Sequence, residues 1–327
     1  MTLSSKQLLR ALPNSVPFVD HTGIDWTQVR RTHYWMYQKF SYEYPGPVRD
    51  LHQRLIIVPP GQHGNQVLED HRLWASSPEV ETRSETDPFG NLVYYLDLPY
   101  IASSVQFESW SSVERLSVAN FAPLLTEAEA DVYREPSRLT MPDARLEAVA
   151  RTLAARESEP GALAEVISNW VWETMHYLSG VTTVATTAAE ALKLSQGLCQ
   201  DYSHIMIALC RLVGLPARYV SGHLLGEGGS HAWVEVLLPS TTRAGLLEAV
   251  AFDPTNHCRA GLRHITVAVG RDYQDVSPTS GHFNAPYNGR LQSSKQAGLI
   301  LVEYFDGQQI TVDDSDMERV EENRRIA

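Results

Sequence analysis

A cysteine, a histidine and an aspartate occur in this order at places where each could take part in acyl transfer. Cys199 lies at the expected start of a helix over residues 199–213. A thiol in the first helical turn lies among N–H groups without intrahelical acceptors and near the positive end of the helix dipole, which favours the nucleophilic thiolate. Gly197 would let the chain turn into this helix and leave room for a substrate backbone. The placement predicts a catalytic nucleophile.

The alternative interpretation of Cys199 is a small core residue. Cys210 is a useful comparison, because it lies further along the same expected helix, among Ile205, Leu209 and Leu212. We interpret Cys210 as a core residue and Cys199, at the helix start, as the nucleophile.

A nucleophilic thiol needs a base, and the base needs a partner that fixes its tautomer. His231 follows the Gly-rich segment "GEGGS" at the start of one expected strand, and Asp253 ends another. If Leu238 pairs with Leu246, the same hairpin register brings His231 opposite Asp253. Taken singly, His231 could be a surface histidine and Asp253 a turn residue before Pro254. The shared register favours a Cys-His-Asp triad.

Two neighbours of this triad have expected structural roles. Asp201 is expected to cap the helix that starts at Cys199 or to pair with Arg218. Trp233 faces the same side of its strand as His231. It is expected in the core, with a pocket wall as the alternative.

A metal site is the main alternative use of the remaining histidines and cysteine in this region, namely His204, His223, His257, His264 and Cys258. No pair of them has a spacing that is diagnostic of zinc. The sequence also has no phosphate-binding or dinucleotide-binding motif in a supporting context. It therefore predicts neither a metal nor a cofactor.

The composition is that of a soluble globular protein, with 327 residues, 43% hydrophobic and 20% charged residues, and a net charge of −12. Nucleic acid is not an expected partner, because general nucleic-acid binders are more often basic. Only 3 cysteines are present, which is typical of a reducing compartment. We find no apolar run of the kind that a signal peptide or a membrane span needs. A cytoplasmic protein without membrane contact is expected.

The elements that must position the triad fall into two groups. Short strands separated by turn residues predict a β-sandwich over residues 31–118. A helical connector is expected over 119–160, with Asp143 at a helix start. Residues 161–312 begin with helices, over 161–177, 186–197 and 199–213, and continue with strands over 217–225, 231–238, 246–253, 264–270 and 297–305. This order is typical of an α+β domain. Residues 1–30 are expected to form a leader segment with weak helical character, and residues 313–327 a charged tail.

Three segments carry a resemblance to a known family: "GLCQDYSHIMIALCRLVGLPARYVSGHL", "SHAWVEVLLP" and "AFDPTN". They resemble the motif blocks of the transglutaminase-like superfamily. The resemblance implies a cysteine-protease-like α+β fold, with helices packed on an antiparallel sheet. It also implies that Cys199 is the nucleophile, His231 the base and Asp253 the orienting acid.

Two further regions extend the resemblance to bacterial members of the superfamily. "HITVAVGRDYQDVSP" resembles the block that follows the triad in them. The segments "YEYPGPVRDLHQRLIIVPP" and "DPFGNLV" resemble the β-domain that precedes their catalytic core. The chain is therefore expected to have an N-terminal β-sandwich and a transglutaminase-like catalytic domain over residues 161–312.

The resemblance implies acyl-enzyme chemistry but leaves the reaction open, because members include amide-forming transferases, peptidases and amidases. Nothing in the sequence identifies an amine-acceptor site. The first prediction is therefore a cysteine peptidase or amidase that cleaves a peptide or protein amide through a thioester. The alternatives are a protein-glutamine transamidase and a binding or scaffold module with a vestigial triad. An acidic Ca²⁺-binding loop is not found, so calcium activation is not expected.

Overall fold

The computed structural model describes residues 16–117 and 122–312. The first 15 residues of the predicted leader segment and the whole predicted tail, 313–327, lie outside this range. The described residues form two compact units. One, here called the sandwich unit, comprises residues 16–117, 223–230 and 278–312, and the other, the core unit, comprises residues 122–222 and 231–277.

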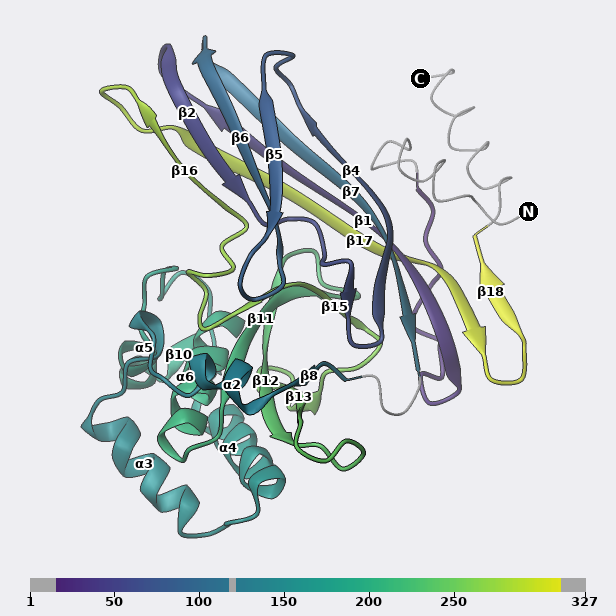
Figure 1. Cartoon of the computed structure of the whole chain (residues 1–327), viewed down its shortest axis with the longest axis vertical. Coiled ribbons are helices and arrows are strands. Elements are labelled where there is room, and N and C mark those ends of the chain that lie inside the picture. The colour runs from purple at the N-terminus through teal and green to yellow at the C-terminus, as the bar shows by residue number, and fades with distance from the viewer. Residues whose placement is uncertain (1–15, 118–121, 313–327) are drawn as a thin grey trace. The chain divides into compact units, whose positions relative to one another are not determined.

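The sandwich unit consists of two β-sheets. The first is built on three long antiparallel strands, in which β1 (Val29–Glu43) lies between β7 (Ser104–Leu116) and β17 (Arg290–Tyr304), as Figure 1 shows. This sheet is completed by β3 (Gln62–His63), β4 (Gln66–Ala75) and β18 (Gln309–Thr311), and the second sheet consists of β16 (Thr279–Asn284), β2 (Val48–Leu55), β6 (Leu92–Ile101) and β5 (Glu81–Thr86). The predicted β-sandwich is confirmed.

Apolar side chains from both sheets fill the space between them. Phe40 of β1 and Phe107 of β7 pack in one cluster with Leu51 of β2 and Leu96 of β6. Each is at most 3% exposed. Alternate residues of a strand point to opposite faces, so the alternation of apolar and polar residues in these segments places one face of each sheet in this core.

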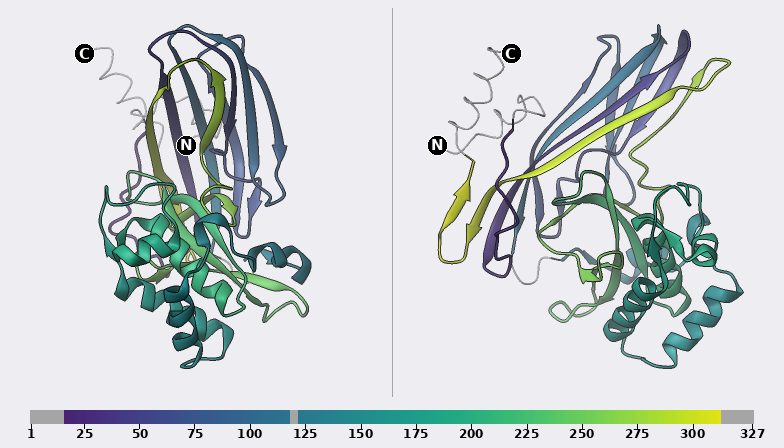
Figure 2. Two further views of the ribbon diagram at one scale, coloured as in Figure 1. Left: turned by 90° about the vertical axis from the view of Figure 1, so that its left-hand side faces the viewer. Right: turned by 180° about the vertical axis from the view of Figure 1, so that it is seen from behind.

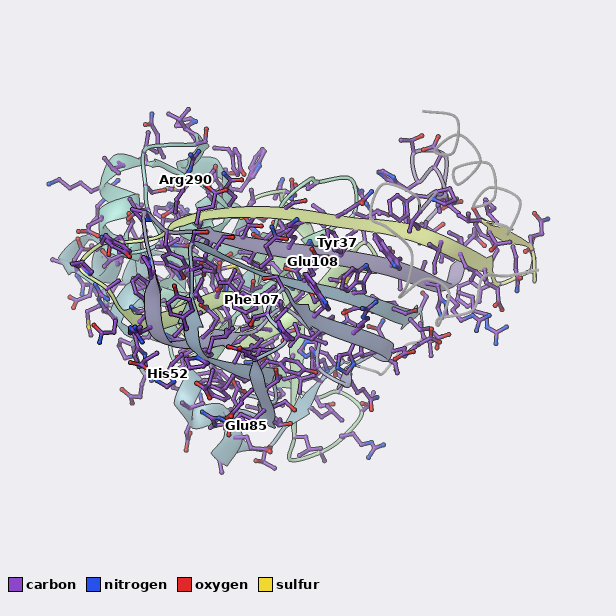
Figure 3. All side chains as sticks on the ribbon, turned by 90° about the horizontal axis from the view of Figure 1, so that it is seen from above. Tyr37, His52, Glu85, Phe107, Glu108 and Arg290 are labelled. Carbon is purple, nitrogen blue, oxygen red and sulfur yellow. The ribbon has the colours of Figure 1, made fainter. Side chains whose placement is uncertain are left out.

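The outer face of the first sheet carries a second, smaller cluster that includes Trp35, Tyr37 and Trp110. Figure 3 shows Tyr37 of β1 close to Glu108 of the neighbouring strand β7. Burial, the charge of Glu108 and a hydrogen bond with it raise the pKa of the Tyr37 phenol. The outer face of this sheet is therefore also packed around Trp35, Tyr37 and Trp110, which explains why β1 carries aromatic residues on both of its faces.

The predicted domain 161–312 needs correction at its C-terminal end. Strand β17, which contains the expected strand 297–305, pairs with β1, from Tyr304 opposite Val29 to Arg290 opposite Glu43. Strand β16 pairs with β2. Residues 278–312 thus belong to the sandwich unit. An apolar run identifies a strand but not its partner, and the partner here lies at the other end of the chain.

The core unit packs helices on an antiparallel sheet, the predicted α+β arrangement. Its sheet has the order β14-β13-β12-β11-β15, with β8 paired to β13. The strands are β8 (Leu124–Leu125), β11 (Ala217–Leu224), β12 (His231–Pro239), β13 (Leu247–Asp253), β14 (Cys258–Arg259) and β15 (His264–Gly270). The strands expected over 217–225, 231–238, 246–253 and 264–270 are confirmed.

The helices of the core unit are α2 (Glu127–Ala130), α3 (Ala144–Ala154), α4 (Pro160–Thr174), α5 (Ala188–Leu194) and α6 (Cys199–Leu212), with 3₁₀ turns at Asp131–Tyr133 and Arg138–Thr140. Helices α3, α4 and α5 each pack against α6, and Figure 2 shows the teal helices gathered beside the green strands of this unit. Asp143 caps α3 as predicted, accepting from Leu146 N at 2.9 Å. The predicted connector 119–160 is therefore part of the core unit as far as it is described.

Helix α6 is central to this unit, since it also packs against β12. Its C-terminal end is held by Arg211, whose guanidinium donates to Tyr133 O at 2.9 Å, Thr140 Oγ1 at 2.7 Å and Ala217 O at 2.9 Å. A buried cation is tolerated where its donors are satisfied in this way. These bonds fix the end of the helix opposite to Cys199.

None of the helices within the described residues combines the length and the apolar character that crossing a membrane requires.

Candidate active site

Cys199 is the first residue of α6 and is half-buried. The N-cap residue of this helix, Leu198, has no polar side chain, so a residue of the first helical turn provides the cap. Asp201 Oδ2 accepts from Leu198 N at 2.7 Å and from Thr182 Oγ1 at 2.7 Å. The capping role predicted for Asp201 is confirmed. The alternative pairing with Arg218 is wrong.

Arg218 instead forms a buried ion pair with Glu235 on the neighbouring strand, with 2.6 Å between Nη2 and Oε2. The two residues lie directly opposite each other in the β11–β12 ladder. A cross-strand pair satisfies both charges locally, so no acid from α6 is needed.

Gly197 has a steric role that the sequence did not reveal. A Cβ atom at this position would clash with the carboxylate of Asp201. The side chain that caps α6 therefore occupies the position that a Cβ atom would take. The glycine is needed for the cap, and through the cap for the placement of Cys199.

His231 and Asp253 are in direct contact. His231 Nε2 lies 2.7 Å from Asp253 Oδ2, and their side chains are 2% and 0% exposed. The predicted register was wrong by two residues, because Val234 lies opposite Phe252. A shift of two residues keeps every side chain on its face of the sheet. The histidine and the aspartate are consequently diagonal neighbours on one face and still meet.

The Asp253 carboxylate collects further hydrogen bonds that the sequence did not reveal. Oδ2 also accepts from His264 Nε2 at 3.1 Å and from Asn256 Nδ2 at 2.9 Å. Oδ1 accepts from the backbone N–H groups of Thr255 at 3.1 Å and Asn256 at 3.2 Å. Burial alone would raise the pKa of Asp253, but the bonds from His231, His264 and Asn256 hold it well below its usual range. The carboxylate is therefore ionised around neutral pH.

The relation of Cys199 to this pair follows from the elements that carry them. Cys199 begins α6, and α6 packs against β12, whose first residue is His231. Cys199 also lies near Tyr219 on β11. The pKa of the Tyr219 phenol is raised mainly by burial, and also by the charge that the Cys199 thiolate would carry. The helix that begins with the nucleophile thus packs on the strand that begins with the base.

The other two thiols differ from Cys199. Cys210 is 0% exposed, and burial raises its pKa to about 12, as expected of a core residue. Cys258 is exposed in β14. Its pKa is raised by burial of the thiol and by the charge of Asp253. Both are disfavoured as thiolates at neutral pH.

The histidines that were considered as metal ligands do not converge as a set. His204 Nε2 accepts from Tyr273 N at 3.2 Å, and burial lowers its pKa to about 4. His257 stacks on Trp172 at 4.2 Å and bonds Asn169 at 2.9 Å. His223 lies near the end of β11 and is buried. The three histidines have separate local environments.

Two groups of described residues nevertheless have ligand atoms close enough to hold a metal ion. One comprises His33, Glu69 and Glu114 of the sandwich unit. There Arg31 bonds Glu114 at 3.1 Å and supplies a competing cation. The other comprises His231, Asp253 and His264, with ligand atoms within 4.8 Å of one another. In that group both imidazoles are already hydrogen-bonded to the carboxylate.

Comparisons with known proteins identify the class. Residues 147–243 match the model of the transglutaminase-like superfamily, and residues 34–114 match that of the bacterial transglutaminase-like N-terminal region. The chain belongs to the transglutaminase-like superfamily. The core match includes Cys199 and His231 and ends before Asp253.

Two mycobacterial relatives are similar over long stretches. "Uncharacterized protein ML0607" of Mycobacterium leprae (strain TN) is 30% identical over 264 residues, which cover 75% of this chain and 90% of the relative. "Uncharacterized protein Rv2569c" of Mycobacterium tuberculosis (strain ATCC 25618 / H37Rv) is 35% identical over 170 residues, or 49% of this chain and 48% of the relative.

A solved structure shares the fold. It is that of a Cytophaga hutchinsonii protein named as a candidate cysteine protease, and it superposes with a TM-score of 0.63 at 19% identity, covering 88% of this chain and 92% of that one. The predicted cysteine-protease-like fold with an N-terminal β-region is thereby confirmed.

Proposed function

We propose that this protein is a thiol acyl-transfer enzyme that hydrolyses amide bonds of peptides or proteins, with Cys199, His231 and Asp253 as its triad. One observation carries the proposal. A buried 2.7 Å hydrogen bond joins His231 Nε2 to Asp253 Oδ2 on strands of the sheet against which the Cys199 helix packs. Membership of the transglutaminase-like superfamily supports the same chemistry.

In this proposal the two ring nitrogens of His231 have different roles. An ionised Asp253 on Nε2 keeps a proton on that nitrogen. The opposite nitrogen, Nδ1, then takes the proton of the Cys199 thiol, and the thiolate attacks the amide carbonyl. We assign stabilisation of the oxyanion to backbone N–H groups at the start of α6, where N–H groups lack intrahelical acceptors. His231 returns the proton to the leaving amine, which departs and leaves a thioester.

Water completes the cycle. His231 takes a proton from the attacking water, the C–S bond breaks, and the carboxylic acid leaves while the thiol regains its proton. A primary amine in place of the water would give transamidation with the same residues. We assign hydrolysis, because water needs no acceptor site of its own.

Alkylation of the thiols tests the triad without knowledge of the natural substrate. At mildly acidic pH, iodoacetamide should label Cys199 rapidly and Cys258 slowly, because the proposal pairs only the Cys199 thiolate with the His231 imidazolium. Labelling is located by peptide mass spectrometry. Equal, slow labelling of the two would contradict the proposal and favour a scaffold module.

The reaction is tested by incubating the protein with glutamine-containing and library peptides, with and without a primary amine. Hydrolysis should dominate among products weighed by mass spectrometry. Cys199→Ser should lower the rate by several orders of magnitude, whereas Cys258→Ser, which removes the thiol opposite Asp253 in the β13–β14 ladder, should have a far smaller effect. Products that contain the amine as the main species would instead establish a transamidase.

A further inference from the structure

We propose that His264 is a positioning residue of this site, a second imidazole that donates a hydrogen bond to Asp253 and thereby sets how the carboxylate holds His231. This inference rests on the proposed function, since it concerns the same triad. It deepens that function by adding a fourth side chain, one that orients the acid and does not touch the substrate.

His264 reaches the acid from the opposite edge of the sheet. It begins β15, whereas Asp253 ends β13, and β12 and β11 lie between these strands in the sheet order. Even so, His264 Nε2 lies 3.1 Å from Asp253 Oδ2, the same oxygen that His231 Nε2 approaches at 2.7 Å. The sheet therefore curls enough for two imidazoles, both at most 5% exposed, to share one carboxylate oxygen.

The tautomer of His264 follows from its other nitrogen. Gly261 N donates to His264 Nδ1 at 3.2 Å, so Nδ1 is an acceptor and carries no proton. The proton of the neutral ring is then on Nε2, where it is donated to Asp253. A metal ion on Nε2 would push that proton onto Nδ1, against the Gly261 N–H. The ring is thus set up as a hydrogen-bond donor and not as a metal ligand.

Trp233 fixes the orientation of both imidazoles. Its ring is stacked with His231 at 6.1 Å and meets His264 edge-on at 5.2 Å. Gly222 on β11 makes this possible, because a Cβ there would lie 2.6 Å from the Trp233 ring and would clash with Ile265 O. The tryptophan passes over the glycine and contacts both histidine rings, whose centroids lie 5.9 Å apart, so the three rings pack as one group.

The consequence concerns the charge on one oxygen. The titratable groups that act on Asp253 are His231 from β12 and His264 from β15, while Cys258 from β14 is itself affected by the Asp253 charge. Each donor to Oδ2 draws negative charge away from the bond to His231. The donation from His264 therefore limits how strongly the acid holds a proton on His231, and it also restrains rotation of the carboxylate.

A matched pair of substitutions isolates this hydrogen bond. His264→Phe keeps a ring against Trp233 but removes the donor, whereas His264→Gln places an amide N–H near the position of Nε2. In His264→Phe we expect Cys199 alkylation and peptide hydrolysis to slow about tenfold, which is the lower end of the cost of losing an orienting partner at such sites. We also expect the His231 titration midpoint, followed by ¹⁵N NMR, to move to higher pH. His264→Gln should restore most of both.

The possible results separate the two proposals. A wild-type Cys199 no more reactive than Cys258 would remove the proposed function, and this inference with it. A reactive wild type with an unchanged rate and unchanged His231 titration in a folded His264→Phe variant would overturn the inference alone. So would equal impairment of the Phe and Gln variants, which would indicate a role in folding only. ¹⁵N shifts that place the His264 proton on Nδ1 would also overturn it.

Discussion

Asp253 is the residue on which the candidate site depends, because five hydrogen bonds converge on its two oxygens. Three come from side chains of His231, Asn256 and His264, and two from the backbone that follows the aspartate. These donors, gathered in a buried place, hold the carboxyl group in its charged form. Most replacements of Asp253 would either clash with these donors or leave them without an acceptor.

The lowered pKa of Asp253 predicts a pH dependence of stability. An acid whose pKa falls below its usual 3.8 on folding stabilises the fold fully above the unfolded value and loses this contribution as pH falls through the folded one. The difference in unfolding free energy between wild type and Asp253→Asn should therefore not shrink between pH 7 and about pH 5. It should then shrink below about pH 4, at up to about 1.4 kcal/mol per pH unit.

Chemical denaturation at several pH values measures this difference. Asp131→Asn is the control, because that side chain is 74% exposed and should show a much weaker trend. If the difference in unfolding free energy between wild type and Asp253→Asn did not change down to pH 3, a charged and strongly hydrogen-bonded Asp253 carboxylate would be ruled out.

At this scale the sequence predicted the histidine–aspartate contact but not its surroundings. The motifs and the predicted register describe a single hairpin. The register was wrong by an even number of residues, so His231 and Asp253 were still predicted on the same face of the sheet. His264 was considered only as a metal ligand. Its strand is not adjacent to β13 in the sheet order, so its approach depends on the curl of the sheet, which no pattern in the sequence records.

Among the elements, the start of α6 depends most directly on its local sequence, because the residues around Cys199 also determine where the thiol lies. Gly197, Leu198 and Asp201 form the turn that presents Cys199. Gly197→Ala should force the Asp201 side chain aside, with a loss of about 1–3 kcal/mol in unfolding free energy and slower alkylation of Cys199.

Denaturant unfolding and timed alkylation measure the two effects. Gly228→Ala is a suitable control, since a Cβ there meets no heavy atom within 4 Å. If Gly197→Ala behaved like this control, the carboxylate would not occupy the space above the glycine.

Most other elements were predictable because their patterns are strong. Helix α4 has apolar residues at helical spacing, and β12 and β15 are bounded by turn residues. Strand β5 (Glu81–Thr86) was missed, because all of its residues are polar and exposed and carry no alternation. Its strand conformation comes from pairing with β6, which is tertiary information.

For the whole molecule, the pairing of β1 with β17 makes a prediction about residues far apart in the chain. Leu299 is 0% exposed and lies opposite Tyr34. Leu299→Asp buries a charge without a partner and should cost more than about 3 kcal/mol. Hydrogen exchange should then quicken in residues 29–43.

Phe305→Ser is the matched control for Leu299→Asp, because Phe305 is 56% exposed. Protection of residues 29–43 should be unchanged in this variant. Unaltered exchange in Leu299→Asp would contradict the pairing.

The sequence predicted the existence of the two units better than it predicted their boundaries. Residues 161–312 were expected to form one domain, and the connector was expected to stand between domains. Propensity and periodicity are local and report neither the partner of a strand nor the unit that a helix joins. The expected cytoplasmic location and peptide or protein substrate stay predictions.

The discontinuity of the sandwich unit also bears on synthesis of the chain. On the ribosome, β1 emerges early, but β17, which covers one of its edges, emerges only after the whole core unit has been made. Because domains generally fold as they become complete, the core unit can fold first. During that time one edge of β1 remains unpaired. An exposed edge strand invites pairing with other chains. The nascent protein is therefore most prone to aggregate in the interval before its last strands are released.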